Sequence, residues 1–296
     1  MADEASERRT EPGALRRKNR WWHVLLVGLL FNVLYILVYL ATDNDNLLPT
    51  ILALGTFLVP VTFAVFLVYR LPQGVVPFSV LAWCAFWSGM INLPLTALIP
   101  NGPYNLLVGP IEESAKLVVP LWFYFHTRYR SEAAGLLIGF SAGLGFAVLE
   151  SLGFNLAAAL NAEDNFLGSL EASLLVRGLL SPFGHMTWTA IICAVLWRER
   201  ERAGRATFNL KVLGTFAVVA LLHTVYDLSE LLFPDSILLQ IGFAVPIGIV
   251  ALVWFFLLLR ESRRELKASD TSAGGGDEVP AAPSVSEEGP LPRPPS

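Results

Sequence analysis

The chain has 296 residues, of which 54% are apolar and only 16% are charged, and its net charge is −4. Soluble globular proteins carry about 25% charged residues, so this composition excludes a water-soluble domain and an intrinsically disordered protein. The basic residues gather toward the two ends of the chain, which excludes a nucleic-acid-binding protein that acts through a basic face. The composition predicts an all-α polytopic membrane protein whose surroundings are the lipid bilayer.

Eight apolar segments have the roughly 20 residues that a helix needs to cross the hydrocarbon core. They are 21–41, 47–69, 75–99, 105–126, 132–158, 171–197, 209–231 and 237–259. The first follows a basic segment, as a signal peptide does, but it is too long for one and no cleavage site of small residues follows. We therefore interpret it as a retained anchor and predict one eight-helix transmembrane domain over residues 21–262.

The distribution of lysine and arginine predicts the orientation, because these residues favour cytoplasmic loops. With eight spans, 19 of the 21 basic residues fall on one side of the membrane, and the loops on the other side hold acidic residues without basic ones. Both termini are predicted to be cytoplasmic in a plasma-membrane protein, with residues 1–20 as a basic segment. Residues 263–296 are rich in proline, glycine and serine and predict a disordered cytoplasmic tail.

Several ionisable residues fall inside the predicted spans, where they are costly and usually face a bundle interior or a water-filled cavity. Those near mid-depth or in the outer half are Glu112, Glu113, Lys116, Glu150, His185, His223 and Asp227. Because four spans contribute them at a common depth, they are predicted to form one polar site. Arg177 lies nearer a span end and is interpreted as snorkelling or pairing with an acid.

Helical spacing indicates which of these side chains meet. Lys116 follows Glu113 by three residues and Glu112 by four, so it can contact either carboxylate. His223 and Asp227 are also four residues apart. These pairs are expected to share a helix face.

Two further patterns concern the fifth and sixth spans. A stripe of small residues that allows close helix approach is formed by Gly135, Gly139 and Gly143. Glu150 falls on the same stripe and is predicted to face the neighbouring helix. Pro182 and Gly184 are predicted to interrupt the sixth span just before His185 and to open a cavity there.

Each feature also has a purely structural interpretation. The glutamates with Lys116 can be a buried ion pair, His185 can be a hydrogen-bonded interior histidine, and His223–Asp227 can be one internal hydrogen bond. Their common depth favours a functional site. The segment G-F-S-A-G at 139–143 matches the G-x-S-x-G pattern of serine hydrolases, but it lies within a helix and lacks the turn that exposes the nucleophile, so Ser141 is not predicted to act.

The residue types allow more than one chemistry. A glutamate can activate water as a general base while a second polar group stabilises the oxyanion of peptide hydrolysis. Alternatively, Glu150, His185, His223 and Asp227 have the ligand types for a divalent metal such as Zn²⁺, whose bound water would attack. The same residues can form the ion path of a proton- or cation-coupled transporter, which the absence of an inverted sequence repeat disfavours. An inactive membrane scaffold is a further alternative.

Four motifs occur in a characteristic order, namely E-E-S-A-K at 112–116, F-A-V-L-E at 146–150, His185, and H-T-V-Y-D at 223–227. This set resembles the PrsW family of intramembrane proteases, which is grouped with the CAAX prenyl endopeptidases and the bacteriocin-processing enzymes. The resemblance covers residues 105–231. In the CAAX relatives the position of Glu150 is typically histidine and that of Lys116 often arginine, so prenyl-protein processing is disfavoured.

The resemblance implies an intramembrane endopeptidase that cuts a membrane-anchored protein, such as an anti-sigma factor, in a signalling cascade. By position, Glu112 or Glu113 would activate water, with Lys116 as their electrostatic partner. The family is classed with metalloproteases, while a metal-free glutamate mechanism has been argued for relatives, and both stay open.

The remaining motif residues would complete this site. Glu150, His185 and His223 would bind the metal or stabilise the oxyanion, and Asp227 would orient His223.

Overall fold

The computed structural model describes residues 20–71, 74–98, 106–162, 165–233 and 236–274. Within these ranges the chain is helical and holds no β-strand, as predicted. Its elements are α1 (Trp21–Thr42), η1 (Asp45–Leu47), α2 (Leu48–Arg70), α3 (Phe78–Ala97), α4 (Val108–Lys116), α5 (Val118–His126), α6 (Glu132–Leu160), α7 (Phe166–Leu180), η2 (Ser181–Phe183), α8 (His185–Ala203), α9 (Leu210–Leu232) and α10 (Ile237–Gly274).

Seven segments of the described chain are long and apolar enough to cross a membrane. They correspond to seven of the eight predicted spans. The predicted span 105–126 instead forms two short helices, α4 and α5, which meet at Leu117. Pro120 accounts for the interruption, because it has no N–H to donate to the Lys116 carbonyl and its ring displaces that group. Length and apolarity therefore identify seven spans rather than eight.

Helix α10 extends further than the sequence predicted. It continues to Gly274, so residues 263–274 are helical where a disordered tail was expected. The segment contains several good helix formers, and it extends a helix that has already formed, so the cost of nucleation does not arise. The rest of the predicted tail, 275–296, and the basic segment over residues 1–19 lie outside the described residues.

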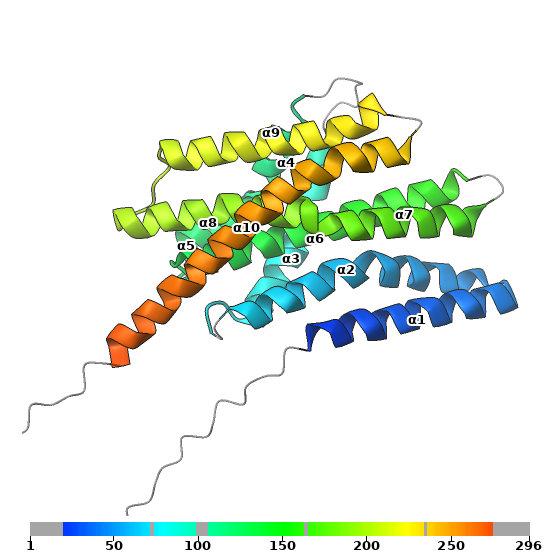
Figure 1. Ribbon diagram of the computed structural model, residues 1–296, viewed down its shortest axis with the longest axis horizontal. Helices are drawn as coiled ribbons and strands as arrows, with labels where there is room; N and C mark the ends of the chain where they lie inside the picture. The colour runs from blue at the N-terminus through cyan, green and yellow to red at the C-terminus, as the bar shows by residue number, and fades with distance from the viewer. Residues whose placement is uncertain (1–19, 72–73, 99–105, 163–164, 234–235, 275–296) are drawn as a thin grey trace, which may run out of the picture.

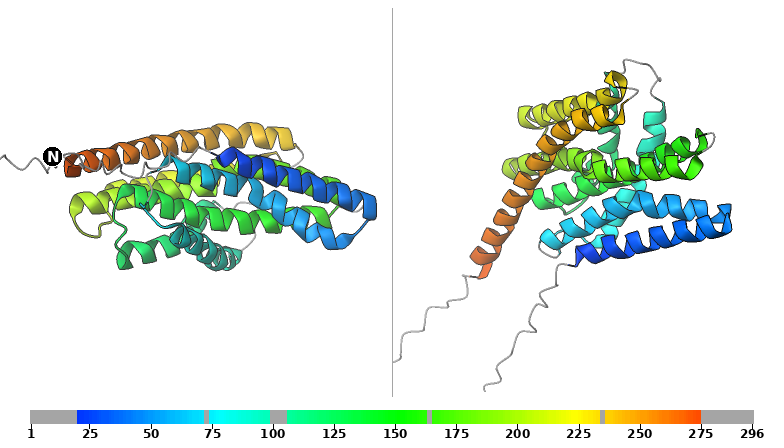
Figure 2. Two further views of the ribbon diagram at one scale, coloured as in Figure 1. Left: turned by 90° about the horizontal axis from the view of Figure 1, so that it is seen from below. Right: turned by 45° about the vertical axis from the view of Figure 1, so that its right-hand side comes forward.

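The helices form an elongated bundle, and the turns that connect them lie at its two ends (Figure 1). The α1–α2, α6–α7 and α9–α10 turns lie at one end, on the right in Figure 1, and the α8–α9 turn lies at the other. Helix α1 packs against α2 at the edge of the bundle, and α10 crosses the bundle obliquely (Figure 2). Helix α6 lies at the centre and packs against α3 and α8.

Polar contacts connect several helix ends at the end of the bundle that carries the basic loops. Arg198 of α8 donates hydrogen bonds to Glu132 of α6 at 2.5 and 2.7 Å and to Glu261 of α10 at 2.6 Å. Arg200 donates to the backbone carbonyl of Tyr124 in α5. The ends of α5 and α8, the start of α6 and the later part of α10 therefore lie together.

The predicted glycine stripe packs α6 against α8. A Cβ on Gly135 or Gly139 would come within 2.6 Å of Trp197 or Cys193, respectively. A Cβ on Gly143 would collide with the backbone carbonyl of His185. Because Gly143 has no side chain, the start of α8 can lie directly against α6, and this contact fixes the position of His185.

Candidate active site

Helix α4 carries three of the predicted site residues. Glu113 and Lys116 are fully buried, and Glu112 is 9% exposed. The helix lies close to α9 because Gly109 has no side chain, and a Cβ there would collide with the backbone carbonyl of Ala220. This close approach brings the glutamates of α4 against His223 of α9.

The Lys116 ammonium lies among the acidic and imidazole groups. It donates hydrogen bonds to Glu112 Oε2 (3.2 Å), Glu113 Oε1 (3.0 Å) and His185 Nδ1 (2.6 Å). These contacts use all three of its N–H groups. Because His185 Nδ1 accepts, a neutral His185 carries its proton on Nε2. Two carboxylates thus compensate a positive charge that would otherwise be costly to bury.

His223 lies between the two glutamates and Asp227. Its Nδ1 is 3.0 Å from Glu113 Oε1, and its Nε2 is 3.5 Å from Glu112 Oε2 and 3.2 Å from Asp227 Oδ2. The ring packs on Trp188, with 4.4 Å between the centroids. Both ring nitrogens are buried, yet neither makes a well-oriented hydrogen bond to a described residue. The three carboxylates therefore surround the imidazole at ion-pair distance.

His185 lies directly after a break in the helical segment. The 3₁₀ turn η2 separates α7 from α8, and Gly184 precedes the first turn of α8. The predicted interruption is thus present. Pro182 and Gly184 explain it, because proline lacks an N–H and glycine adopts the irregular backbone at low cost.

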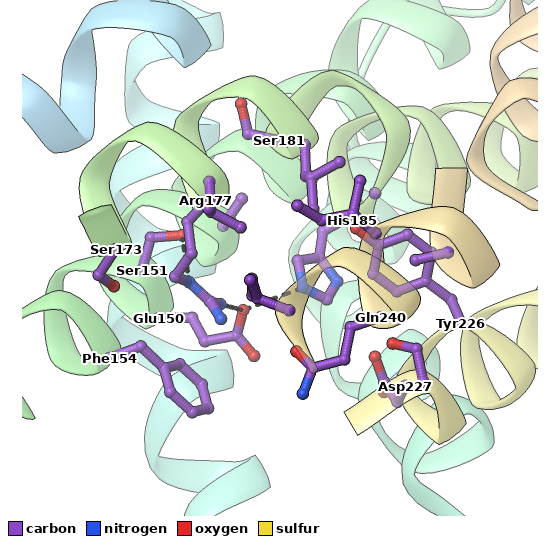
Figure 3. Close-up of a pocket in the computed structure, with 18 of the residues that line it drawn as sticks. Glu150, Ser151, Phe154, Ser173, Arg177, Ser181, His185, Tyr226, Asp227 and Gln240 are labelled. Atoms are coloured by element: carbon purple, nitrogen blue, oxygen red, sulfur yellow. Dashed lines mark hydrogen bonds and ion pairs between the residues drawn. The ribbon is translucent and has the colours of Figure 1, made fainter. Parts of the chain in front are cut away.

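Glu150 and Arg177 extend the cluster toward α7. Glu150 Oε2 accepts hydrogen bonds from His185 Nε2 and from Arg177 Nη2, each at 3.0 Å. Arg177 also donates to Ser151 Oγ at 3.3 Å and lies 4.1 Å from the centre of the Phe154 ring. Figure 3 shows Glu150 between the guanidinium and the imidazole. The prediction that Glu150 faces a neighbouring helix is confirmed.

A cavity of about 810 Å³ opens beside these residues. Helices α6 and α7 form one side and α9 and α10 the other, and Figure 3 shows Gln240 and Asp227 across from Glu150. Many lining residues are small, namely Ala147, Ser151, Ala158, Ser169, Ala172, Ser173, Ser181, Gly184, Ser229 and Ala244. A lining of small side chains leaves room for a peptide segment, and its polar groups can form hydrogen bonds with that segment.

The two adjacent glutamates differ in access to this cavity. Glu112 lines it, together with His185 and Asp227. Glu113 is fully buried and is not among the lining residues. Its Oε2 accepts a hydrogen bond from Thr189 Oγ1 at 3.2 Å, and its Oε1 accepts from Lys116. Glu112 is therefore the glutamate that a substrate or water in the cavity can reach.

The structure brings all seven predicted site residues into one continuous series of contacts, running from Asp227 through His223, Glu112, Glu113, Lys116 and His185 to Glu150. Arg177, left open between snorkelling and pairing, pairs with an acid. The sequence reasoning missed Thr189 and Trp188. Neither is ionisable, so only their position on α8, one turn after His185, could have indicated them.

Three of the clustered residues are close enough together to hold a metal ion. Glu112, His185 and His223 each offer one ligand atom, and these atoms lie within 4.8 Å of one another. Glu150 is not in this group, and the predicted set of Glu150, His185 and His223 stays a prediction. The Glu150 carboxylate instead accepts hydrogen bonds from His185 Nε2 and Arg177.

Residues 48–259 match the description PrsW family intramembrane metalloprotease. The chain belongs to this family. The match spans the helices that build the cluster and the cavity, and it confirms the resemblance inferred from the four motifs. This PrsW protein is accordingly a multi-pass membrane protein with the fold of an intramembrane protease. Comparisons with curated proteins and with solved structures return no significant match.

The family description implies a metal ion, and the donor set of this PrsW protein fits one. One carboxylate and two imidazoles are a usual ligand set for catalytic zinc, which keeps an open position. The two buried nitrogens of His223 without a well-oriented hydrogen bond agree with this role. An ion bound through Glu112 Oε2 and His185 Nδ1 would have to displace the Lys116 ammonium from both atoms.

Proposed function

We propose that this PrsW protein is an intramembrane endopeptidase in which Glu112 acts as the general base. The observation that carries this proposal is the difference between the two glutamates, since Glu112 lines the cavity while Glu113 is fully buried. Glu112 would take a proton from a water molecule as the water attacks the substrate carbonyl carbon. The same carboxyl group would then return the proton to the leaving amine as the C–N bond breaks.

The other residues would hold Glu112 and stabilise charge. Lys116 and Arg177 lie on either side of His185. Lys116 is 2.6 Å from His185 Nδ1, and Arg177 is linked to His185 Nε2 through Glu150. Their positive charges would stabilise the oxyanion electrostatically in a site of low dielectric constant. Asp227 would hold His223, and Thr189 would hold Glu113.

A metal ion would fit the same residues if the Lys116 ammonium moved away from Glu112 and His185. If one is bound, Glu112, His185 and His223 would hold it, and it would supply an activated water and polarise the carbonyl. Glu113 and Lys116 would then form an ion pair beside it, as they do here at 3.0 Å. In that case Glu112 would be a metal ligand rather than the general base, and the same residues would still form the hydrolytic site.

The cavity between α6–α7 and α9–α10 supports a membrane-anchored protein as the substrate. A peptide bond must leave its helix to be hydrolysed, and Arg177, Gln240 and the serines of the lining can hydrogen-bond an unwound backbone. An anti-sigma factor cut in a signalling cascade is the kind of substrate that family membership suggests. We propose the plasma membrane as the location.

We also propose eight membrane crossings, with both termini in the cytoplasm. Thr224 of α9 donates a hydrogen bond to the Leu106 carbonyl just before α4, and Tyr124 near the end of α5 contacts Arg200 at the basic end. Together, α4 and α5 cover much of the depth that one long helix covers elsewhere. The 19 basic residues outside the spans would then all face the cytoplasm.

The experiment is cleavage of a single-pass peptide substrate by the full chain in lipid vesicles. Glu112→Gln is expected to reduce kcat by about 10²–10⁴. The matched control is Glu171→Gln, since Glu171 is a glutamate of α7 outside the cluster and outside the cavity lining. Equal activity of wild type and Glu112→Gln would overturn the proposal.

A chelator arm separates the two mechanisms. Loss of cleavage on chelation and recovery with Zn²⁺ would assign the activated water to the metal. Cleavage that persists under chelation but is lost in Glu112→Gln would assign it to the glutamate alone. Proton or cation uptake into the vesicles without any cleavage would favour a transporter instead.

A further inference from the structure

A second cavity, of about 330 Å³, lies between α2 and α10, away from the site described above. We call it the arginine groove, and it is lined by Phe66, Arg70, Phe256, Leu259, Arg260 and Arg263. Residues 66 and 70 are four apart on α2, and 256, 259, 260 and 263 follow the three- and four-residue spacing of one face of α10. Two helix faces therefore direct three guanidinium groups toward one small space.

The apolar part of the arginine groove closes the gap between the two helices. The Phe66 and Phe256 rings meet edge to face at 6.3 Å between centroids, and Leu259 is buried. The guanidinium carbon of Arg70 lies 4.7 Å from the centre of the Phe66 ring. Charged groups thus lie next to an apolar base, as at the boundary between headgroups and acyl chains.

The three guanidinium groups have no acidic partner among the described residues. Arg70, Arg260 and Arg263 form no ion pair there, whereas Arg198 at the same end contacts both Glu132 and Glu261. Snorkelling alone would explain exposed arginines, but it does not require three to converge on one cavity. Uncompensated positive charge at one point favours an anionic ligand.

The neighbouring surface of α10 continues the pattern toward the middle of the helix. Val253, Phe256 and Leu257 are 53%, 37% and 58% exposed and precede Arg260 on the same side of α10. This stripe can contact acyl chains while the arginines contact a phosphate. Basic pockets between transmembrane helices are known to hold anionic lipid headgroups.

We propose that the arginine groove binds the headgroup of an anionic phospholipid, with the acyl chains along the exposed stripe of α10. Arg70, Arg260 and Arg263 would contact the phosphate, and Phe66 with Phe256 would pack against the glycerol and the first methylenes. The site is independent of the proposed protease activity, because none of its residues lies in the catalytic cluster or its cavity.

The test is lipid binding to the delipidated full chain in mild detergent, followed by native mass spectrometry. Phosphatidylglycerol, phosphatidylcholine and soluble glycerol phosphate are titrated separately. Phosphatidylglycerol is expected to bind at least about tenfold more tightly than either of the others. Equal binding of phosphatidylcholine, or glycerol phosphate binding as tightly as the lipid, would overturn the proposal, and this comparison needs no variant.

Variants then locate the site. Arg70→Gln/Arg260→Gln/Arg263→Gln is expected to weaken phosphatidylglycerol binding by about tenfold or more. The control, Arg128→Gln/Arg205→Gln/Arg264→Gln, removes the same charge at the same end but outside the groove, and is expected to retain binding. The single variant Arg260→Gln changes an exposed residue and is expected to show a few-fold loss. Equal loss in both triple variants would mean surface electrostatics without a site.

Discussion

The two halves of α6 differ in packing, and the proposed catalytic cluster lies where they meet. From Glu132 to Gly143 every residue is buried, and the glycine stripe holds this half against α8. From Glu150 to Leu160 most residues are partly or fully exposed, and several line the cavity. The comparison teaches that one half of the helix fixes the position of reactive groups and the other leaves space for a substrate.

The buried half of α6, from Glu132 to Gly143, which we call the packed half, should tolerate substitutions least. Gly143→Ala places a Cβ against the His185 carbonyl and is expected to shift α8, reducing cleavage by at least about 100-fold because misplaced catalytic groups lose their orientation. Gly153→Ala on the same helix meets no atom within 4 Å and serves as the control. Cleavage in vesicles measures both, and unchanged cleavage by Gly143→Ala would contradict the role given to the packed half.

Glu150 lies near the junction of the two halves of α6. Substitution of its partner Arg177, on α7, should have the next largest effect. Arg177→Gln removes a charged partner of Glu150, which then holds His185 less firmly, and we expect about a tenfold loss of kcat. Arg177→Lys should not restore full activity, because an ammonium cannot contact Glu150 and Ser151 through one planar group. An Arg177→Gln enzyme with normal kcat would leave Arg177 a purely structural residue.

Thr189 tests the buried side of the cluster. Thr189→Val keeps the shape but removes the hydrogen bond to Glu113, and about a fivefold loss of kcat is expected, equal to one ordinary hydrogen bond. Thr189→Ser should recover most of the activity, since it restores the hydroxyl. Equal kcat in the Val and Ser variants would show that this hydrogen bond does not position Glu113.

The cavity beside the exposed half of α6 should affect substrate binding rather than chemistry. Ala172→Phe narrows the cavity and is expected to raise KM a few-fold with little change in kcat. Ala157→Phe adds the same ring to an exposed position of α6 outside the cavity lining and should change neither value. A raised KM in both variants would indicate that added bulk, rather than the cavity, matters.

Much of the site could be predicted because the information is local. The spacing of Glu112, Glu113 and Lys116 determines their contacts on one helix, and the glycine register determines where Glu150 points. Pro182 marks the break before His185. The all-helical structure and the approximate positions of most spans follow from apolar length alone.

Other features depend on packing between helices, which spacing does not encode. Gly109 allows α4 to lie close to α9, and in this packing Glu112 lines the cavity whereas Glu113 does not. Arg177 reaches Glu150 from a different helix. The packing of α4, α8 and α9 likewise places Glu112, His185 and His223 together as a possible metal site. The break at Pro120 and the length of α10 show that apolarity does not define helix ends.

The central claim is that Glu112, which faces the cavity, performs the chemistry, while substrate binding depends on the cavity beside the exposed half of α6. It is tested most directly by single-turnover cleavage and substrate crosslinking by Glu112→Gln in the same vesicles. The account predicts a cleavage rate about 10²–10⁴ lower with crosslinking equal to wild type. Cleavage at the wild-type rate would contradict it.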